Sequence, residues 1–443
     1  MKPSPWRFFA VLLLLAFIGP FSLQAQNQTD EALLRQLDRG TEEVMARVVA
    51  WRRDIHQHPE LGNREVRTAK LVANHLRELG LEVREGVAHT GVIGVLRGAR
   101  PGAVVALRAD MDALPVTEAV DLPFASKVRT TYEGQEVGVM HACGHDMHVA
   151  ILMGAAEVLS AVREQLSGTV VFIFQPAEEG PPDGEEGGAD LMIREGALEN
   201  PRPEAIFALH VGPGTLGRIT YRPEGIGAAA DDLRIVVHGR QTHGGMPWAG
   251  VDPIVASAQI INALQTITSR QMALTRAASV VSIGMIQGGV RRNIIPDSVT
   301  MRGTIRTLDR EQRADIHERI RRTAEKTAEA SGATAEVTIT LGVPVTWNDP
   351  ALTEQMAPTL RRVARNNDAT LQPPGTWAED FAFFQEKIPG LYFNLGVSAE
   401  GTDPATAAGN HSPLFFADER ALPVGVRAMA HLAVDYLSAA GGR

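Results

Sequence analysis

The stretch "GTVVFIFQPAEEG" at residues 168–180 runs from a continuous apolar segment directly into two adjacent glutamates, Glu178 and Glu179. An unbroken run of Val, Ile and Phe is typical of a strand that is buried on both faces of a sheet. Two carboxylates at the end of such a strand are costly to bury unless a positive charge compensates them. The stretch therefore predicts a buried strand that leads into a site holding positive charge.

Three further apolar runs end in, or lead into, polar side chains. They are residues 102–115, with Asp110 and Asp112; 204–213, with His210; and 390–397, which precede His411. Between the first run and the glutamates, the apolar spacing after Asp146 is that of a helix. Strands that alternate with helices predict an α/β domain with a mixed, mostly parallel sheet, in which ligands bind beyond the carboxyl ends of the strands.

The pattern changes after Gly227. Residues 228–342 contain alternating strands and two amphipathic helices in the order β-α-β-β-α-β, which is the ferredoxin-like unit. Asp252 followed by Pro253 predicts the start of the first of these helices. We therefore expect an α+β domain at 228–342, inserted into a catalytic domain formed by residues 30–227 and 343–443.

The N-terminus has the layout of a secretory signal peptide. Lys2 and Arg7 precede an apolar run over residues 8–18, and the small residue Ala25 follows. The alternative is an uncleaved anchor, but the apolar core is short for a full membrane span. We expect a signal peptide at residues 1–25 and a secreted enzyme, periplasmic where the cell has an outer membrane, with no stable membrane span after cleavage.

Composition restricts the remaining function classes. The chain has 443 residues, 44% of them hydrophobic, and a net charge of -9, which argues against a general nucleic-acid binder. Its one cysteine, Cys143, excludes an intrachain disulfide. In an oxidising compartment such a thiol is expected to be either buried and inert or bound to a metal.

Several side chains of the chain are good ligands for a borderline metal ion: Cys143, His145, Glu179, His210 and His411. The densest cluster is "HACGHD" at residues 141–146. A divalent cation would explain the glutamate pair, because one carboxylate can bind the ion while the other accepts a proton from water.

Each of these residues also has an ordinary structural explanation. A lone histidine such as His210 is more often a hydrogen-bonded structural residue, and Cys143 a small buried hydrophobe. Asp110 and Asp112 could be turn or cap residues. Their common placement at strand ends or in the linking loop favours a metal site, but spacing alone does not identify the reaction.

Motifs along the chain resemble those of the hippurate hydrolase and indole-acetyl-amino-acid hydrolase group. They are "HQHPELGNRE" (56–65), "LRADMDALP" (107–115), "MHACGHDMHVAILMGAA" (140–156), "FQPAEEG" (174–180), "NIIPD" (293–297), "GTIR" (303–306), "EDF" (379–381) and "NHSP" (410–413). This group consists of two-metal amidohydrolases related to aminoacylase and carboxypeptidase. The resemblance implies a zinc-peptidase-like catalytic domain with an inserted lid or dimerisation domain.

The resemblance also implies roles for the candidate ligands. Cys143 would be a bridging ligand and His145 a terminal one, with Glu179, His210 and His411 completing the shells of two divalent ions per subunit. Manganese, zinc, cobalt and nickel all suit these ligands. Glu178 would be the general base, and Asp112 would orient His145 or tune a metal ligand.

In the inserted domain, His243 matches a histidine that stabilises the oxyanion, often across a dimer interface. Asn293 and Arg306 match residues that grip the α-carboxylate of the substrate. We therefore expect a homodimer through this domain. Trp248 stands where the family often has a second histidine, and residues 181–187 form an acidic insertion whose Glu185 and Glu186 we expect to be solvated.

The expected function is metal-dependent hydrolysis of the amide bond of N-acyl amino acids or short peptides with a free carboxylate. The small-molecule product is an amino acid. One alternative is a broad-specificity metallocarboxypeptidase or dipeptidase, which the same site would serve. Another, from a different class, is a catalytically silent ligand-binding protein of the same fold. The identity of the acyl group is left open.

Overall fold

The computed structural model describes the backbone of residues 20–441 and the side chains of residues 31–440. The predicted signal peptide lies outside the described residues, apart from the start of the first helix, α1 (Pro20–Gln57). Among the helices that the structure does describe, none combines the length and apolarity needed to cross a membrane.

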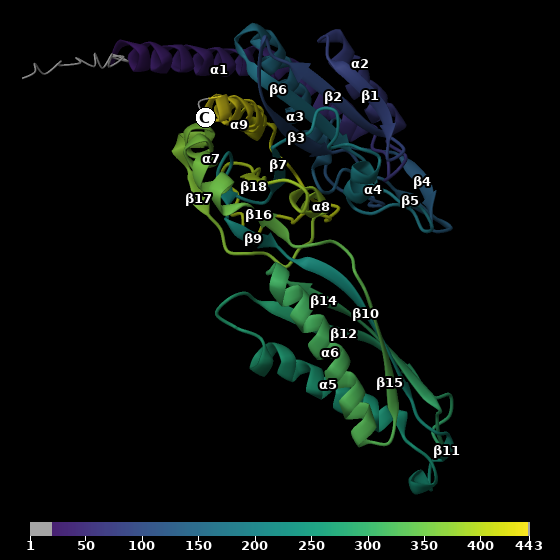
Figure 1. The fold of residues 1–443 in the computed structure, drawn as a ribbon. Coiled ribbons are helices and arrows are strands. Elements are labelled where there is room, and N and C mark those ends of the chain that lie inside the picture. Colours follow the sequence, from purple (N-terminus) through teal and green to yellow (C-terminus); the bar gives the residue numbers. More distant parts are fainter. Residues whose placement is uncertain (1–19, 442–443) are drawn as a thin grey trace, which may run out of the picture.

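The catalytic domain is built on an eight-stranded mixed sheet (Figure 1). In spatial order its strands are β1 (Glu82–Val87), β2 (Gly91–Arg97), β6 (Ser167–Gln175), β3 (Arg100–Asp110), β7 (Ala205–Gly212), β18 (Gly390–Gly396), β8 (Ile219–Tyr221) and β17 (Ala369–Leu371). The four central strands, β6, β3, β7 and β18, are parallel, and the neighbouring strands β2 and β8 run antiparallel to them. The four apolar runs of the sequence are these central strands, so their prediction is confirmed.

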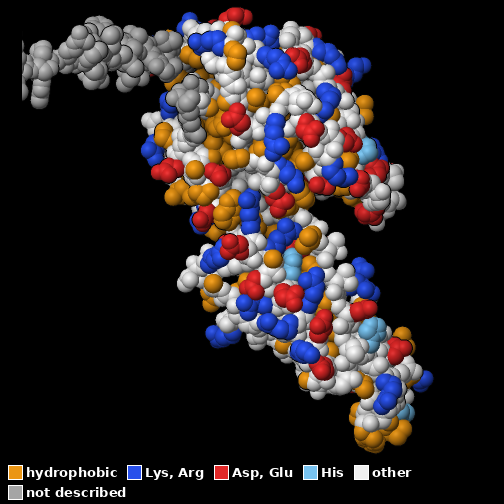
Figure 2. All heavy atoms as spheres, in the orientation of Figure 1, with side chains coloured by type: hydrophobic (Ala, Val, Ile, Leu, Met, Phe, Trp, Pro, Cys, Tyr) orange, Lys and Arg blue, Asp and Glu red, His pale blue; other side chains and the backbone are white. Residues whose placement is uncertain are grey.

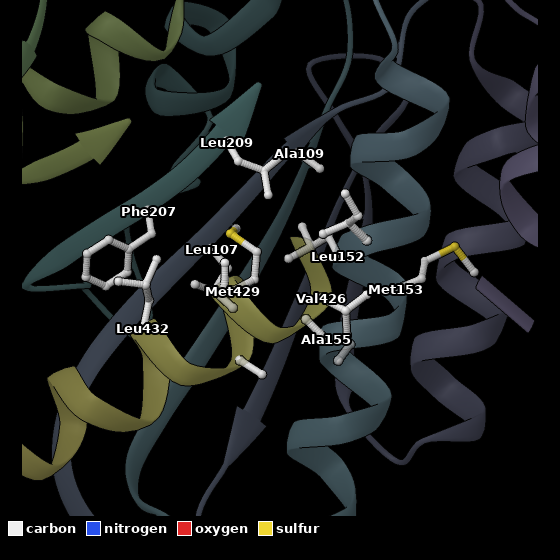
Figure 3. Packing of buried hydrophobic residues seen from close by; sticks show 14 of the residues in the cluster. Leu107, Ala109, Leu152, Met153, Ala155, Phe207, Leu209, Val426, Met429 and Leu432 are labelled. Carbon is white, nitrogen blue, oxygen red and sulfur yellow. The ribbon is translucent and has the colours of Figure 1, made fainter. Parts of the chain in front are cut away.

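Helices cover both faces of this sheet. The larger core lies under α1, α2 (Val66–Glu78), α3 (His145–Ala161), α7 (Pro350–Val363) and α9 (Leu422–Gly441); the smaller one lies under α4 (Gly188–Arg194) and α8 (Phe381–Gln385). Figure 3 shows Leu107 of β3 and Phe207 of β7 packed against Met429 and Leu432 of α9. Alternate residues of β7, such as Ala208, face the smaller core. Burial on both faces explains why these strands are continuously apolar.

The inserted domain has its own four-stranded antiparallel sheet. Its spatial order is β12 (Ser279–Gly288), β14 (Ser298–Thr307), β10 (Ala229–His238) and β15 (Thr334–Thr340), and α5 (Pro253–Thr266) and α6 (Arg310–Ala330) share one core with it. Asp252 caps α5 by accepting hydrogen bonds from the N–H groups of Ile254 and Val255, as the sequence predicts. The strand order is that of the predicted ferredoxin-like unit. Strand β12 is an edge of this sheet.

Three two-stranded pairs complete the strands. They are β4 (Arg129–Tyr132) with β5 (Gln135–Gly138), β9 (Glu224–Gly227) with β16 (Thr346–Asn348), and β11 (Thr242–His243) with β13 (Ile294–Ile295). The β9–β16 pair lies where the chain enters and leaves the inserted domain. There the ring of Trp377 lies against Gly227, so close that a Cβ atom on this glycine would meet the ring at 2.4 Å. The N–H of Ala228 also donates to the carbonyl of Trp377 at 2.8 Å.

A buried carboxylate secures the base of the inserted domain. Asp231 of β10 accepts hydrogen bonds from Arg313 and from the backbone N–H of Gly342, at 3.0 Å each, and pairs with His317 at 2.8 Å. Burial opposes ionisation, but the hydrogen bonds from Arg313 and His317 lower the pKa of Asp231 below its usual value. Helix α6 is thereby fixed to the sheet at the end nearest the catalytic domain.

Candidate metal centre

The five predicted ligands converge in space, although they come from distant parts of the chain. Their ligand atoms form two groups, each with all atoms within 4.8 Å of one another: Cys143, His145 and His210 in the first, and Cys143, Glu179 and His411 in the second. Cys143 therefore belongs to both groups. This is the arrangement expected of two neighbouring cation sites that share a thiolate.

The donor atoms fit a pair of divalent cations. The Sγ atom of Cys143 lies 3.3 Å from Nε2 of His210, and Nε2 of His411 lies 3.0 Å from Oε1 of Glu179. Nε2 of His145 is buried without a hydrogen-bond partner among the described residues. Buried polar atoms are normally satisfied, so this nitrogen is the atom that a bound cation would use. Thiolate, imidazole and carboxylate together suit a borderline metal ion.

A glycine allows the two ligands of "HACGHD" to approach one site. Gly144 separates Cys143 from His145, the first residue of α3, and has the left-handed backbone conformation with φ of 88°. A Cβ atom at this position would lie 2.3 Å from Cγ2 of Val211. The turn that aims both ligands inward therefore requires glycine for its conformation and for its close packing.

Asp112 connects two ligands of the centre. Its Oδ1 atom lies 3.2 Å from Nδ1 of His145, and its Oδ2 atom accepts a hydrogen bond from the backbone N–H of Glu179 at 2.9 Å. Nδ1 of His145 is thereby occupied, which leaves Nε2 free to act as a ligand. These contacts are those that the role implied by the resemblance requires of Asp112.

Sequence reasoning assigned no role to a second buried pair beside the centre. Asp110 pairs with Nδ1 of His148 at 2.5 Å, and Nε2 of His148 accepts a hydrogen bond from the N–H of Val211 at 2.9 Å. His148 lies one helical turn after His145 in α3, and that spacing was the signal available in the sequence. The pair links α3 to the end of β7, next to His210.

The centre carries an excess of negative charge. Burial and the neighbouring Glu179 and Glu178 raise the pKa of the Cys143 thiol well above its ordinary value. Burial disfavours the charged form of His145, but Asp110 and Asp112 raise its pKa to about 10. Without cations, these shifts favour a proton on each of Cys143 and His145, two of the residues that would bind metal. Divalent cations would displace these protons and compensate the carboxylates.

Glu178 lies beside the ligand groups and is nearly buried, with 9% of its side chain exposed. Its Oε2 atom is 3.9 Å from Nε2 of His145. Burial, together with the charges of Glu379 and Glu179, raises the pKa of Glu178 well above its ordinary value. A carboxyl group in this environment is suited to accept and release a proton, provided that nearby cations favour its ionised form.

A fully buried arginine lies behind Glu178. Arg108 bonds to Oδ2 of Asp110 at 2.6 Å, to Oε1 of Glu379 at 3.0 Å and to Oδ1 of Asp380 at 3.1 Å. The backbone N–H of Asp380 in turn reaches Oε1 of Glu178 at 3.5 Å. The motifs "LRADMDALP" and "EDF" contain these residues, but the spacing of the motifs gave no indication that they meet.

The centre opens into a cavity of about 750 Å³. One end is lined by metal-centre residues, namely Cys143, Glu178, Glu179, His210 and His411. The rest of the lining includes residues of strands β18 and β8, the loop after β7, and Trp377. A cavity of this size accommodates a small molecule next to Glu178 and the ligand groups.

Three predicted substrate-contacting residues do not reach this cavity within one chain. His243 is exposed in β11, and the carbonyl of Asn293 accepts a hydrogen bond from the N–H of Gly244 beside it. Both lie at the end of the inserted domain that is remote from the catalytic domain (Figure 1). Arg306 pairs with Ala230 near the opposite end of β14, about 30 Å away for a strand of this length. A single chain thus does not bring Asn293 and Arg306 together on one carboxylate.

The two departures from the family pattern also lie outside the cavity lining. Trp248 is 79% exposed beside β11. In the acidic insertion, the side chain of Glu186 is exposed as expected, but Glu185 pairs with Arg64 at 2.5 Å and accepts a hydrogen bond from Asn63. The side chain of Glu185 is 33% exposed, so it remains in contact with solvent as expected while also linking this loop to the segment before α2.

Comparison with known proteins agrees with this geometry. Residues 106–435 match the model of peptidase family M20/M25/M40. The chain is 41% identical to thermostable carboxypeptidase 2 of Saccharolobus solfataricus, over 91% of this chain and 99% of that protein. It is 36% identical to the IAA-amino acid hydrolase ILR1-like 2 of Arabidopsis thaliana, over 97% of this chain and 94% of that protein. The crystal structure of Bacillus subtilis YXEP, described as a dinuclear metal binding peptidase of the M20 family, matches with a TM-score of 0.74 and 37% sequence identity. The match covers 90% of this chain and 99% of that one.

These matches confirm the predicted family and fold class. They cover nearly the full length of both partners, and the matched region contains all the ligand candidates as well as the inserted domain. The chain is therefore a hydrolase that belongs to peptidase family M20/M25/M40.

Proposed function

We propose that this protein is a dinuclear metal-dependent amidohydrolase that cleaves the amide bond of N-acyl amino acids, or of short peptides with a free carboxylate, and releases an amino acid. One observation carries the proposal. Two groups of metal-ligating atoms share Cys143, and Glu178 lies beside both of them at the end of a cavity. A binding protein would need the cavity but would have no use for an acid-base group in this position.

The residues of the chain have distinct roles in this proposal. When bound, two divalent cations would polarise the substrate carbonyl and lower the pKa of water. Glu178 accepts the proton of the attacking water and returns it to the leaving nitrogen, so that the amine departs neutral. Asp112 holds His145 and the backbone of Glu179 in place. The donor set is compatible with manganese, zinc, cobalt or nickel.

A broad-specificity carboxypeptidase is the second candidate. The name of the Saccharolobus solfataricus relative favours it, while the name of the Arabidopsis thaliana relative favours an amino-acid conjugate. Both reactions break an amide next to a free carboxylate and need the same acid-base group. The two candidates differ only in the group on the acyl side of the bond.

We also propose a homodimer formed through the inserted domain. Strand β12 is an open sheet edge with exposed side chains, among them Met285 (50%) and Ile286 (51%). Hydrophobic side chains also gather at the remote end of the domain (Figure 2), where Val290 is 99% exposed. Open edges and apolar patches of this kind are usually covered by a partner. A second subunit could then bring His243 and Asn293 to this cavity.

Export is a further part of the proposal, and it rests on the N-terminal sequence. The mature protein would begin after Ala25 and act outside the cytoplasm, in the periplasm where there is an outer membrane. N-terminal sequencing of the protein purified from its natural host tests this directly. A mature chain that begins at Met1 would contradict it.

The substitution Glu178→Gln tests the reaction. It keeps the size of the side chain but removes its ability to accept a proton, so hydrolysis of N-acyl amino acids should fall by about 10²–10⁴-fold. The metal content should stay near that of the unmodified protein. Glu186→Gln is the matched control, because it makes the same change in the same loop outside the cavity, and it should leave the rate unaltered. Full turnover in Glu178→Gln would refute the assignment of the base.

A further inference from the structure

A row of polar side chains leads from the metal centre across the floor of the cavity. In the sheet, Asn394 of β18 lies directly opposite His210 of β7 on one side and Thr220 of β8 on the other. Residues directly opposite one another project from the same face of a sheet. Adjacent strands are about 4.8 Å apart, so the row extends about 10 Å from the strand of His210.

The far end of the row is a hydrogen-bonded cluster. The hydroxyl of Thr220 donates to Oε1 of Gln372 at 2.5 Å, and Nδ2 of Asn394 donates to the same oxygen at 2.9 Å. The side-chain oxygen of Gln372 therefore accepts two hydrogen bonds. The side-chain nitrogen, Nε2, makes no hydrogen bond within the part of the chain that the structure describes, and all three residues line the cavity.

Arg218 adds a positive charge at this end. Its Nε atom donates to Asp368 at 2.7 Å, whereas its two terminal nitrogens have no hydrogen-bond partner among residues 31–440. Arg218 lines the same cavity, and its side chain is 42% exposed. The groups left unused at this end, the amide nitrogen of Gln372 and the terminal nitrogens of Arg218, are all donors. They match a substrate group that accepts hydrogen bonds and carries negative charge.

We propose that this row selects acyl groups that end in a carboxylate, such as succinyl and glutaryl groups. The inference rests on the proposed function, in which the amide carbonyl lies at the metal centre. The α-carboxylate of the amino acid would be bound by the inserted domains, so the acyl group is the part that extends over the row. Trp377 borders the same cavity and offers an apolar surface to the methylene chain.

The test compares two acyl groups of the same length. N-glutaryl and N-pentanoyl derivatives are prepared from the amino acid whose N-acetyl derivative the metal-loaded enzyme cleaves fastest. They differ by a carboxylate in place of a methyl group. A charged hydrogen bond in the cavity should make kcat/KM for the glutaryl substrate about 10- to 100-fold higher.

Two substitutions test whether the polar row causes the preference for the glutaryl substrate. Gln372→Leu and Arg218→Met should each lower the glutaryl-to-pentanoyl ratio by about tenfold, with turnover of the N-acetyl substrate retained. Arg365→Met is the matched control, because Arg365 is an ion-paired surface arginine outside the cavity lining, and it should leave the ratio unchanged.

The outcomes separate this inference from the proposed function. Cleavage of the N-acetyl substrate with no preference for glutaryl over pentanoyl would overturn the inference alone. Variants that slow all three substrates equally would overturn it as well. If no N-acyl amino acid is cleaved by the metal-loaded enzyme, the proposed function fails and the inference fails with it.

Discussion

One carboxylate oxygen of Asp112 accepts a hydrogen bond from the backbone N–H of Glu179, and the other lies within hydrogen-bond distance of Nδ1 of His145. One side chain thus positions a ligand from each of the two cation sites. Asp112 is itself fully buried and lies at the end of β3, the strand beside that of the glutamate pair. The orientation of the centre is therefore coupled to the register of the central sheet.

Replacing Asp112 should weaken metal binding without removing a ligand. In Asp112→Asn the side chain keeps its size but loses its charge, so it supports His145 poorly. Metal affinity should fall by about 10–100-fold, as measured by equilibrium dialysis and metal analysis. Asp121→Asn, at an exposed aspartate, is the control and should bind metal normally. Unchanged affinity in Asp112→Asn would show that the contact does not position the ligands.

The close packing at Gly144 predicts a large cost for a single methyl group. Gly144→Ala combines a left-handed backbone with a 2.3 Å approach to Val211. Gly401 has a similar φ of 86°, but nothing lies within 4 Å of a Cβ atom there. Gly401→Ala should therefore cost only the conformational penalty of about 1–2 kcal/mol. Gly144→Ala should cost about 1–3 kcal/mol more.

Urea unfolding of the two glycine variants measures both values, and metal analysis shows whether the Cys143–His145 turn still binds ions. Equal destabilisation by the two substitutions would mean that the loop moves freely away from Val211. The packing argument at Gly144 would then be wrong.

The contacts of Asp231 predict a dependence of stability on pH. The folded-state pKa of Asp231 lies below its usual value, which is about 3.9 in an unfolded chain. The folded protein therefore binds this proton less readily than the unfolded chain does. The stabilisation is complete above the unfolded-state pKa and is lost as the pH falls towards the folded-state pKa.

Asp231→Asn should therefore lower the free energy of unfolding by about 3 kcal/mol at pH 7, because it leaves Arg313 and His317 without their carboxylate. The difference between the two proteins should shrink between about pH 5 and pH 3. Urea titrations at a series of pH values measure it. A difference that stays constant over this range would exclude ionisation of Asp231 as its cause.

The remote position of His243 predicts that two defective subunits can restore activity together. His243→Ala and Glu178→Gln should each be inactive alone. In a mixed dimer of the proposed kind, the subunit with an intact Glu178 would receive His243 from its partner. After equal amounts are mixed and subunits exchange, about a quarter of normal activity should return.

Ile286→Lys on β12 should prevent both dimer formation and this recovery, whereas Val66→Lys, at an exposed position on α2, should prevent neither. Light scattering reports the oligomeric state. Persistent inactivity of a mixture that demonstrably contains mixed dimers would refute the role of His243 across the interface.

Patterns that depend on local sequence were predictable here. Continuous apolar runs identified the four central strands, and the Asp252–Pro253 pair identified the start of α5. The candidate ligands could also be picked out, because thiol, imidazole and carboxylate groups at strand ends or in the linking loops are few, and the structure brings them together. The buried cluster of Arg108 with Asp110, Glu379 and Asp380 could not be predicted from the sequence. An arginine inside an apolar strand gives no sign of its partners, and Glu379 lies more than 250 residues further along the chain.

The separation of Asn293 from Arg306 was equally inaccessible. Both belong to neighbouring motifs in the sequence. Only the strand pairing shows that Asn293 lies beside the β11–β13 pair, whereas Arg306 lies near the far end of β14, opposite Ala230. Likewise, the row of Asn394 and Thr220 depends on which strands become neighbours. Residue spacing does not contain that information.

Trp377 borders the substrate cavity while its ring lies against Gly227, the residue at which the chain enters the inserted domain. Any swing of that domain about its connecting strands must disturb the indole, and so must a substrate that fills the cavity. In a variant that keeps Trp377 and replaces the other four tryptophans of the chain, indole fluorescence would report any rotation of the inserted domain without an attached dye.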